Sequence, residues 1–427
     1  MTQTVSTVLQ QIAEEAKGSK DWYFTSLAHH ITVDFLTEAF KQVRKDAAAG
    51  VDGQTAAEYE QNLGENLKKL HEMLKSQRYR APAVKRVWIP KDGGERPIGL
   101  PTIEDKIVQR AAVMLLEQIY EEDFHEFSFG FRKGCSCHQA VSAIREQCQG
   151  GNINWIIDAD ITNCFGSLSH SVLRELLKRR VRDGSMIRLI GKWLNAGVLE
   201  DQQLSYPESG APQGGVISPL LMNVYMHYVL DEWFVEEVQP RMKGKVFLVR
   251  YADDFVIGCE REDDALRIME VLPKRLGKYA LEANTSKTKL VNFERPTTGS
   301  KGKGTFTFGG FTLYWARSRQ GYWVVKKRTA KKRMRRTIRN LYLWCKYNRH
   351  EPISVQHKKL SQKLNGHYAY FGVIGNYEQM ALVYYRTLCA WHKWLNRRGG
   401  KTNITLERFL RILDTFPLPK PRIIHAI

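Results

Sequence analysis

The sequence predicts an α+β fold, built from a helical N-terminal extension (1–80), a mixed region (81–315), a basic helical region (316–395) and a short C-terminal segment (396–427). Three observations predict it. Apolar residues recur at helical spacing in the first segment, short β-prone runs begin at Ala83, and after Tyr314 little strand signal remains beyond 322–325. At 427 residues the chain is also too long for one ordinary compact domain.

The first segment reads as helices separated by turn residues. Thr32 is placed to cap a helix that carries Phe35 and Phe40 on one face, and the breaker Gly50–Gly53 ends this pattern. A second apolar stripe runs from Leu63 to Leu74. These stripes indicate core packing rather than a ligand site.

The middle of the chain alternates strands and helices. Runs at 84–89 and 97–100, joined by the turn signal Lys91–Gly94, predict a hairpin. The remaining predictions are helices around 103–120 and 173–194 and strands at 155–160, 246–251 and 255–259. This texture indicates a mixed α and β region.

Composition excludes several classes of protein. Apolar residues make up 43% of the chain and charged residues 26%, which is typical of globular proteins rather than disordered or membrane-spanning ones. No apolar run approaches the roughly 20 residues of a membrane-spanning helix, and Met1–Val5 does not read as a secretory signal. Seven scattered cysteines fit a reducing compartment, and the pair in Cys135–His138 lacks the second pair of a zinc finger. We expect a cytoplasmic protein.

The charge predicts a polyanionic partner. The net charge is +20 and the pI about 9.6, which favours nucleic acid before a membrane surface. Between Arg317 and Arg349 there are 13 basic residues and no acidic one. Interleaved aromatic and apolar residues favour an ordered helical nucleic-acid surface over a disordered arm or a solvated helix face. The candidate RNA-binding residues are Lys326, Lys327, Arg328, Lys331, Lys332, Arg333, Arg335 and Arg336.

Two acidic elements predict a metal site. Asp253 and Asp254 lie between two apolar strands, at the tip of a predicted hairpin. Adjacent carboxylates repel each other unless cations sit between them, although a solvated acidic turn is the simpler alternative. Asp158 and Asp160 end another apolar strand and share one face of it. A strand-borne carboxylate and an acidic hairpin together could hold two metal ions for phosphoryl transfer.

Seven motifs in order resemble the reverse transcriptases encoded by group II introns, the intron maturases. They are Ile89–Pro101, Ser128–Arg132, Asp160–Phe165, Ala211–Leu220, Tyr251–Asp254, Phe306–Phe311 and Leu364–Gly372. The resemblance covers nearly the whole chain. It implies a right-hand polymerase, with fingers and a palm built on antiparallel sheet, followed by an α-helical thumb or maturase domain.

The resemblance also implies roles for individual residues. Asp160, Asp253 and Asp254, with the carbonyl of Ile161, would hold two Mg²⁺ ions, and Asp158 would support them. The implied nucleotide-binding residues are Lys91, Arg96, Arg132, Gln213 and the steric gate Phe165. The implied primer grip is Phe308, Gly309, Gly310 and Phe311. Gly166, Lys133 and Gly309 depart from the usual pattern, which puts the fine shape of the fingers and primer grip in doubt.

The implied function is an RNA-directed DNA polymerase that extends a DNA primer on intron RNA with deoxynucleoside triphosphates. It would also bind that RNA in a ribonucleoprotein, promoting splicing and retromobility. The alternatives are a splicing cofactor with a vestigial polymerase and a domesticated enzyme of host repair or defence. The last 80 residues contain only Cys389, so no HNH endonuclease is expected. The sequence leaves homodimer formation open.

Overall fold

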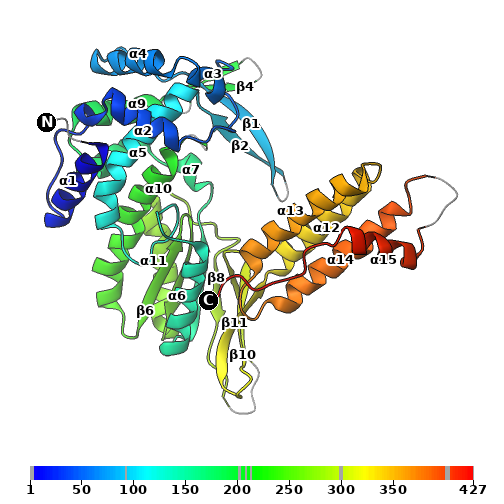
Figure 1. Cartoon of the computed structure of the whole chain (residues 1–427). Coiled ribbons are helices and arrows are strands. Elements are labelled where there is room, and N and C mark those ends of the chain that lie inside the picture. The colour runs from blue at the N-terminus through cyan, green and yellow to red at the C-terminus, as the bar shows by residue number, and fades with distance from the viewer. Residues whose placement is uncertain are drawn as a thin grey trace. The chain divides into compact units, whose positions relative to one another are not determined.

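The computed structural model describes residues 4–91, 94–200, 203–206, 209–211, 214–297, 302–399 and 404–426 (Figure 1). It divides into two compact units. The first comprises Met1–Ser136, Ala159–Ile257 and Asp263–Lys289, and the second comprises Cys137–Asp158, Gly258–Glu262 and Leu290–Ile427. The predicted division into four segments follows function rather than compact packing, and it stays a prediction. Its boundary at 315/316 falls inside a strand, where Ala316 pairs with Val324.

The N-terminal helices are confirmed. They are α1 (Val5–Gly18), α2 (Val33–Gln42), α3 (Ala56–Glu60) and α4 (Leu63–Lys75), with a short 3₁₀ turn η1 (Ala28–His30). The Thr32 hydroxyl accepts a hydrogen bond from the Phe35 amide at 3.3 Å, which caps α2 as predicted. Both α1 and α2 pack against the long, largely buried helix α5 (Ile103–Asp123).

The predicted hairpin is confirmed and belongs to a four-stranded sheet of order β2-β1-β4-β5. Strands β1 (Val84–Lys91) and β2 (Gly94–Leu100) are antiparallel. The first residues of β1 run parallel to β4 (Val198–Glu200), and β5 (Gln203–Ser205) completes the edge.

The helical stretch predicted over 173–194 is two helices, α8 (His170–Lys178) and α9 (Gly184–Leu194). Asp183 accepts hydrogen bonds from the Ser185 and Met186 amides, so it caps a new helix and ends the continuity. Short α7 (Cys164–Ser167) precedes them. The elements that follow are α10 (Ser218–Met226), two π-helical turns η2 (His227–Asp231) and η3 (Phe234–Val238), a 3₁₀ turn η4 (Gln239–Arg241), and α11 (Glu262–Gly277).

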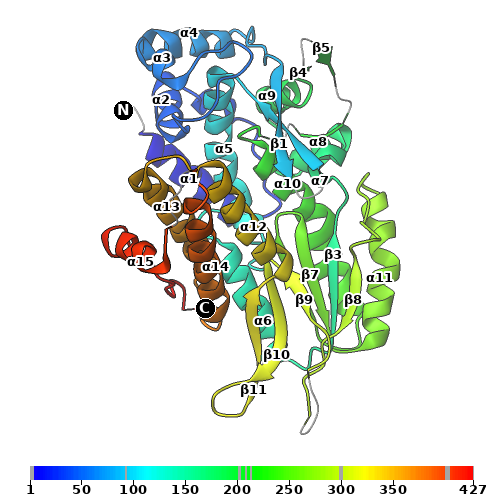
Figure 2. The ribbon, with the colours of Figure 1, turned by 90° about the vertical axis from the view of Figure 1, so that its right-hand side faces the viewer.

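A second four-stranded sheet carries the predicted acidic residues. Its order is β6-β7-β3-β8, and Figure 2 shows β7, β3 and β8 side by side. The strands are β3 (Trp155–Asp160), β6 (Val246–Tyr251), β7 (Asp254–Cys259) and β8 (Lys289–Asn292). The first three were predicted, because each is an apolar run that meets a carboxylate. The fourth was not.

The second unit contains α6 (Cys137–Gly150) and a three-stranded sheet of order β11-β10-β9. They are β9 (Phe306–Phe308), β10 (Phe311–Arg317) and β11 (Trp323–Thr329). Strand β11 begins in the run 322–325, where the sequence keeps a strand signal, and extends to Thr329 into the stretch predicted to be helical. Lys326, Lys327 and Arg328 therefore lie on a strand and not on the predicted helix. Alternating buried and partly exposed residues along β11 give the strand its period of two.

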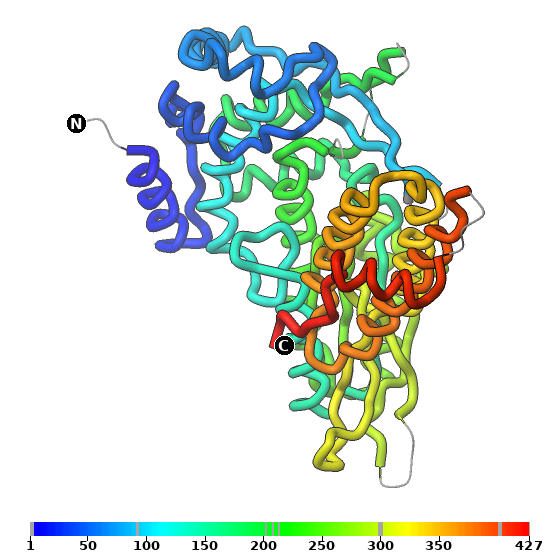
Figure 3. The backbone as a smooth tube through the Cα atoms, turned by 45° about the vertical axis from the view of Figure 1, so that its right-hand side comes forward, coloured from blue at the N-terminus to red at the C-terminus, as the bar shows by residue number. Residues whose placement is uncertain are grey.

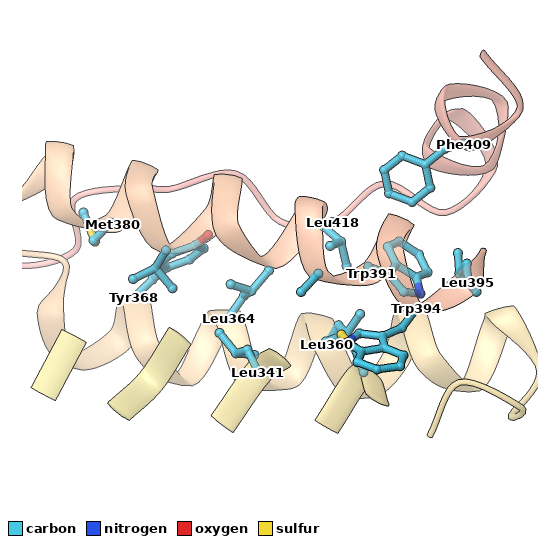
Figure 4. Close-up of a cluster of buried hydrophobic side chains, with 13 residues drawn as sticks. Leu341, Leu360, Leu364, Tyr368, Met380, Trp391, Trp394, Leu395, Phe409 and Leu418 are labelled. Carbon is cyan, nitrogen blue, oxygen red and sulfur yellow. The ribbon is translucent and has the colours of Figure 1, made fainter. Parts of the chain in front are cut away.

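Four helices follow: α12 (Lys331–Tyr347), α13 (Ile353–Phe371), α14 (Tyr377–Leu395) and α15 (Leu406–Thr415). Leu341 of α12, Leu364 of α13 and Trp391 of α14 meet in one apolar core (Figure 4). The C-terminal segment runs back along these helices (Figure 3), and the Ile424 amide donates to the Gly372 carbonyl at 2.7 Å. None of the described helices is long and apolar enough to cross a membrane.

Candidate active site

The acidic residues of the first unit meet at one end of the β6-β7-β3-β8 sheet. The Asn154 amide donates to the Cys259 carbonyl at 3.0 Å, so the start of β3 lies beside the end of β7 and the two strands are antiparallel. Asp160, the last residue of β3, therefore lies level with Asp254, the first residue of β7. The two predicted acidic elements thus come together.

The pKa of one buried thiol depends on carboxylates from both acidic elements. The pKa of Cys164 is raised to about 12, first by burial and next by the negative charge of Asp253. Asp160 raises this pKa further, whereas Arg250 opposes the shift. Carboxylates from the end of β3 and from the β6–β7 turn therefore act on the same side chain.

Asp160 is held by polar residues that the sequence analysis missed. Its Oδ2 atom accepts from Lys287 Nζ at 2.6 Å and from Asn284 Nδ2 at 3.3 Å, and its carbonyl accepts from the Asn284 amide at 2.8 Å. The next residue, Ile161, is buried and forms an isolated antiparallel bridge with Ala283. More than 120 residues separate Lys287 from Asp160 in sequence, so no local spacing points to this contact.

The turn between β6 and β7 is tightly supported. Ala252 adopts φ = 61°, in the left-handed region that non-glycine residues rarely occupy. The Phe129 amide donates to the Arg250 carbonyl at 2.8 Å, and Ser128 forms a bridge with Arg250. The predicted fingers motif 128–132 therefore lies directly against the acidic turn.

Phe165, the predicted steric gate, lies close to the nucleotide-site loop. Its ring is 8% exposed and packs edge-on against Phe131, which is 52% exposed, at a centroid distance of 6.4 Å. The Ala211 amide donates to the Phe165 carbonyl at 2.8 Å. A cavity of about 330 Å³ opens beside this junction, lined in part by Asn163, Gly166 and Gly210 and by residues of β1 and β2.

Of the other predicted nucleotide-binding residues, the structure describes the side chains of Arg96 and Arg132. Gln213 and the side chain of Lys91 lie outside the described residues, and Arg96 is exposed on β2, opposite Ile89. Arg132 is largely buried and its guanidinium is bound internally, to Glu121 at 2.9 Å and to two backbone carbonyls at 2.8 Å. These bonds give Arg132 a structural role and argue against its predicted contact with nucleotide or nucleic acid.

The predicted primer grip forms the β9–β10 turn of the second unit. Phe308 and Phe311 are buried, while Gly309 and Gly310 have φ values of 57° and 82°. The Tyr370 hydroxyl donates to the Gly309 carbonyl at 2.7 Å. A Cβ atom at Gly309 would lie 2.1 Å from Cys137 Sγ, so a bulky residue does not fit at this position of the turn.

The predicted RNA surface is partly exposed. On α12, Lys331, Lys332, Arg333 and Arg335 are exposed and Arg336 is half-buried. On β11, however, Lys327 is only 4% exposed, and burial followed by the nearby charge of Arg145 lowers its pKa to about 8. Lys327 is therefore poorly placed to meet a phosphate, which corrects the prediction for this residue.

Comparison with known proteins identifies the family. Residues 89–316 match the family described as reverse transcriptase (RNA-dependent DNA polymerase). The chain belongs to this family. It is 31% identical over 301 residues to the group II intron-encoded protein LtrA of Lactococcus lactis subsp. cremoris, a match covering 67% of this chain and 50% of LtrA. This reverse transcriptase is also 32% identical over 323 residues to protein YkfC of Escherichia coli K12, covering 67% of the chain and 82% of YkfC.

A third relative, nuclear intron maturase 2 of Arabidopsis thaliana mitochondria, is 28% identical over 176 residues, covering 32% of the chain and 24% of that protein. Proteins named as group II intron-encoded and as an intron maturase are thus among those that this reverse transcriptase resembles. The chain spans about half the length of LtrA. The combination of helices and largely antiparallel sheets agrees with the predicted right-hand polymerase fold.

Reverse transcriptases generally use divalent metal ions, and the carboxylate donor set suits them. Within the described part of the chain, no three His, Cys, Asp or Glu side chains already converge as a metal site. The Asp160 side chain is nevertheless 33% exposed, and it attracts the ammonium of Lys287 in the structure. Asp160 thus binds a cation, and the carboxylates of the adjacent turn are hard oxygen donors. This chemistry fits Mg²⁺.

Proposed function

We propose that this protein is an RNA-directed DNA polymerase of a group II intron, which extends a DNA primer on an RNA template with deoxynucleoside triphosphates. The observation that carries the proposal is the convergence of Asp160 with the Asp253–Asp254 turn at one end of a sheet. Carboxylates gathered in this way suit in-line phosphoryl transfer between a primer 3′-hydroxyl and a nucleotide α-phosphorus.

In this proposal Asp160, Asp253 and Asp254, with the Ile161 carbonyl, would hold two Mg²⁺ ions. Bound metal would lower the pKa of the attacking hydroxyl and stabilise the leaving pyrophosphate. The Phe165 ring would lie under the sugar and exclude a 2′-hydroxyl by its bulk. Exposed Arg96 would face the triphosphate from the fingers, where positive charge offsets the charge of the leaving group.

The test is extension of a DNA primer on an RNA template with deoxynucleotides and Mg²⁺. Wild-type protein should synthesise DNA, and Asp253→Asn with Asp254→Asn should abolish synthesis while RNA binding survives. Asp46→Asn is a matched control, because Asp46 is an exposed carboxylate that pairs with its near neighbour Arg44 at 2.8 Å. Near-wild-type synthesis by the double variant would refute the metal assignment.

We also propose that the exposed basic face of α12 binds the intron RNA and supports splicing. Lys331, Lys332, Arg333 and Arg335 are exposed on this helix, and a run of exposed cations suits a phosphate backbone. Lys331→Glu with Lys332→Glu should weaken RNA binding and reduce the slope of log K against log salt by about 1.5. The matched control is Lys68→Glu with Lys69→Glu, another exposed lysine pair on a helix. Equal effects of both pairs would refute a specific α12 surface.

A further inference from the structure

Arg250 is a buried charge directly before the acidic turn. It is the fifth residue of β6, it interrupts an otherwise apolar strand, and it is 0% exposed. Its Nε and Nη2 atoms donate to the two carboxylate oxygens of Asp231 at 2.8 and 2.5 Å. A buried ion pair of this kind is often no more stabilising than an apolar pair of similar volume. Its presence here therefore calls for a reason other than stability.

The remaining donor of Arg250 reaches the acidic turn itself. Nη1 donates to the Ala252 carbonyl at 3.0 Å and to Asn223 Oδ1 at 3.1 Å. The Ala252 carbonyl belongs to the peptide plane that joins Ala252 to Asp253. Fixing that carbonyl fixes the plane, and with it the direction in which Asp253 leaves the turn. The left-handed conformation of Ala252, which costs roughly 1–2 kcal/mol for a non-glycine residue, needs such support.

The same network is anchored on two further elements. Asn223, buried on α10, donates from Nδ2 to the Gly130 carbonyl at 2.6 Å. Asp231 is the last residue of the π-helical turn η2 and is fully buried. Single π-helical turns are frequent at functional sites. Three elements of the first unit thus converge on one guanidinium.

We propose that Arg250, Asp231 and Asn223 form a clamp that fixes the Ala252–Asp253 peptide and so aims the Asp253 carboxylate. Arg250 is a positioning residue in this scheme, since it acts through the turn and touches no reacting atom. The role in catalysis rests on the proposed polymerase function, whereas the structural role of the clamp does not.

The clamp is tested with Arg250→Lys. A lysine keeps the positive charge but has no planar fork, so it cannot bind Asp231 through two nitrogens and the Ala252 carbonyl at once. We expect kcat for primer extension to fall about 100-fold, as for a displacement of about 1 Å, with little change in KM for the nucleotide. Asn223→Ala, which leaves the Arg250–Asp231 pair intact, should give a smaller loss of kcat.

Arg180→Lys is the matched control for loss of a buried arginine. Arg180 is 2% exposed and pairs with Asp123 at 2.9 Å, but its other bonds go to backbone carbonyls between Ala16 and Trp22. This variant should lower the melting temperature without a selective loss of kcat. A wild-type kcat in Arg250→Lys, or the same loss of kcat in Arg180→Lys, would overturn the catalytic role.

A second measurement is independent of polymerase activity. Amide hydrogen exchange across residues 251–254 should accelerate in Arg250→Lys and stay unchanged in Arg180→Lys. Unchanged exchange in Arg250→Lys would refute the clamp itself. If wild-type protein extended no primer while exchange changed as expected, the polymerase proposal would fail and the clamp would stand.

Discussion

Gly130 offers a sharp test of how closely the fingers motif must approach the acidic turn. A Cβ atom added at Gly130 would lie 2.1 Å from the Ala252 backbone nitrogen, whereas real Cβ atoms essentially never come closer than 3.0 Å. Gly130→Ala must therefore displace one backbone segment by about 0.9 Å. Neither neighbour is a flexible side chain, and the turn carries Asp253. A displacement of about 1 Å in a reacting group can cost about 100-fold in rate.

The assay is single-turnover primer extension on an RNA template, with thermal melting measured in parallel. Gly64→Ala is the control, because a Cβ at this exposed position of α4 meets nothing within 4 Å. Ala should stabilise that helix by roughly 0.5–1 kcal/mol and leave the rate unchanged. A wild-type rate from folded Gly130→Ala protein would refute the argument that this contact sets the geometry of the turn.

Three further predictions concern stability. Burial raises the pKa of Asp105 to about 7, although its hydrogen bond from Tyr79 opposes the shift. Between about pH 4 and pH 7 the Asp105 carboxyl keeps its proton in the native protein, whereas in the unfolded chain its pKa is near 3.9 and it loses the proton. The free energy of unfolding should therefore fall by up to about 4 kcal/mol as pH rises from 4 to 7. Asp105→Asn should flatten this dependence, measured by urea unfolding at pH 5 and 8, and an unchanged profile would contradict the assignment. Gly309→Ala should lower the melting temperature, because its Cβ would lie 2.1 Å from Cys137 Sγ. Adding Cys137→Ala should remove the clash, so that the double variant keeps only the loss of stability from left-handed strain, roughly 1–2 kcal/mol. If the losses of stability of the two single variants simply added, the clash would be excluded. Asp183→Ala removes the acceptor of four backbone amides and should cost about 2–4 kcal/mol by urea unfolding; a loss below about 0.5 kcal/mol would show that the cap is dispensable.

The sequence predicted those parts of the site whose signal is local. Strands β3 and β6 are apolar runs that end at or beside carboxylates, so the period and the charge pointed to the same place. Lys287 was missed because only the folding of the chain brings it to Asp160. Arg250 could have been found from the sequence, because a charged residue inside an apolar strand needs a buried partner.

Only the start of strand β11 was predicted, from the run 322–325, because its charged residues obscured the rest. Its lysines and arginine resemble the helix that follows, yet Val325 and Lys327 lie on the buried face of a strand. Helix α6 was also missed, although Ala140, Val141 and Ile144 have helical spacing. Ser136 three residues before Gln139, and Gly151 after the helix, are boundary signals that could have found it.

The burial of Cys164 has a practical consequence for work with this enzyme. A thiol with a pKa of about 12 holds almost no thiolate at neutral pH, so it resists alkylation and oxidation although it lies beside the carboxylates. Of the seven cysteines, all of them in described positions, Cys389 on α14 is exposed and Cys135 is intermediate. Mild maleimide treatment should therefore favour Cys389, which places a fluorophore on α14 while the acidic site stays unmodified.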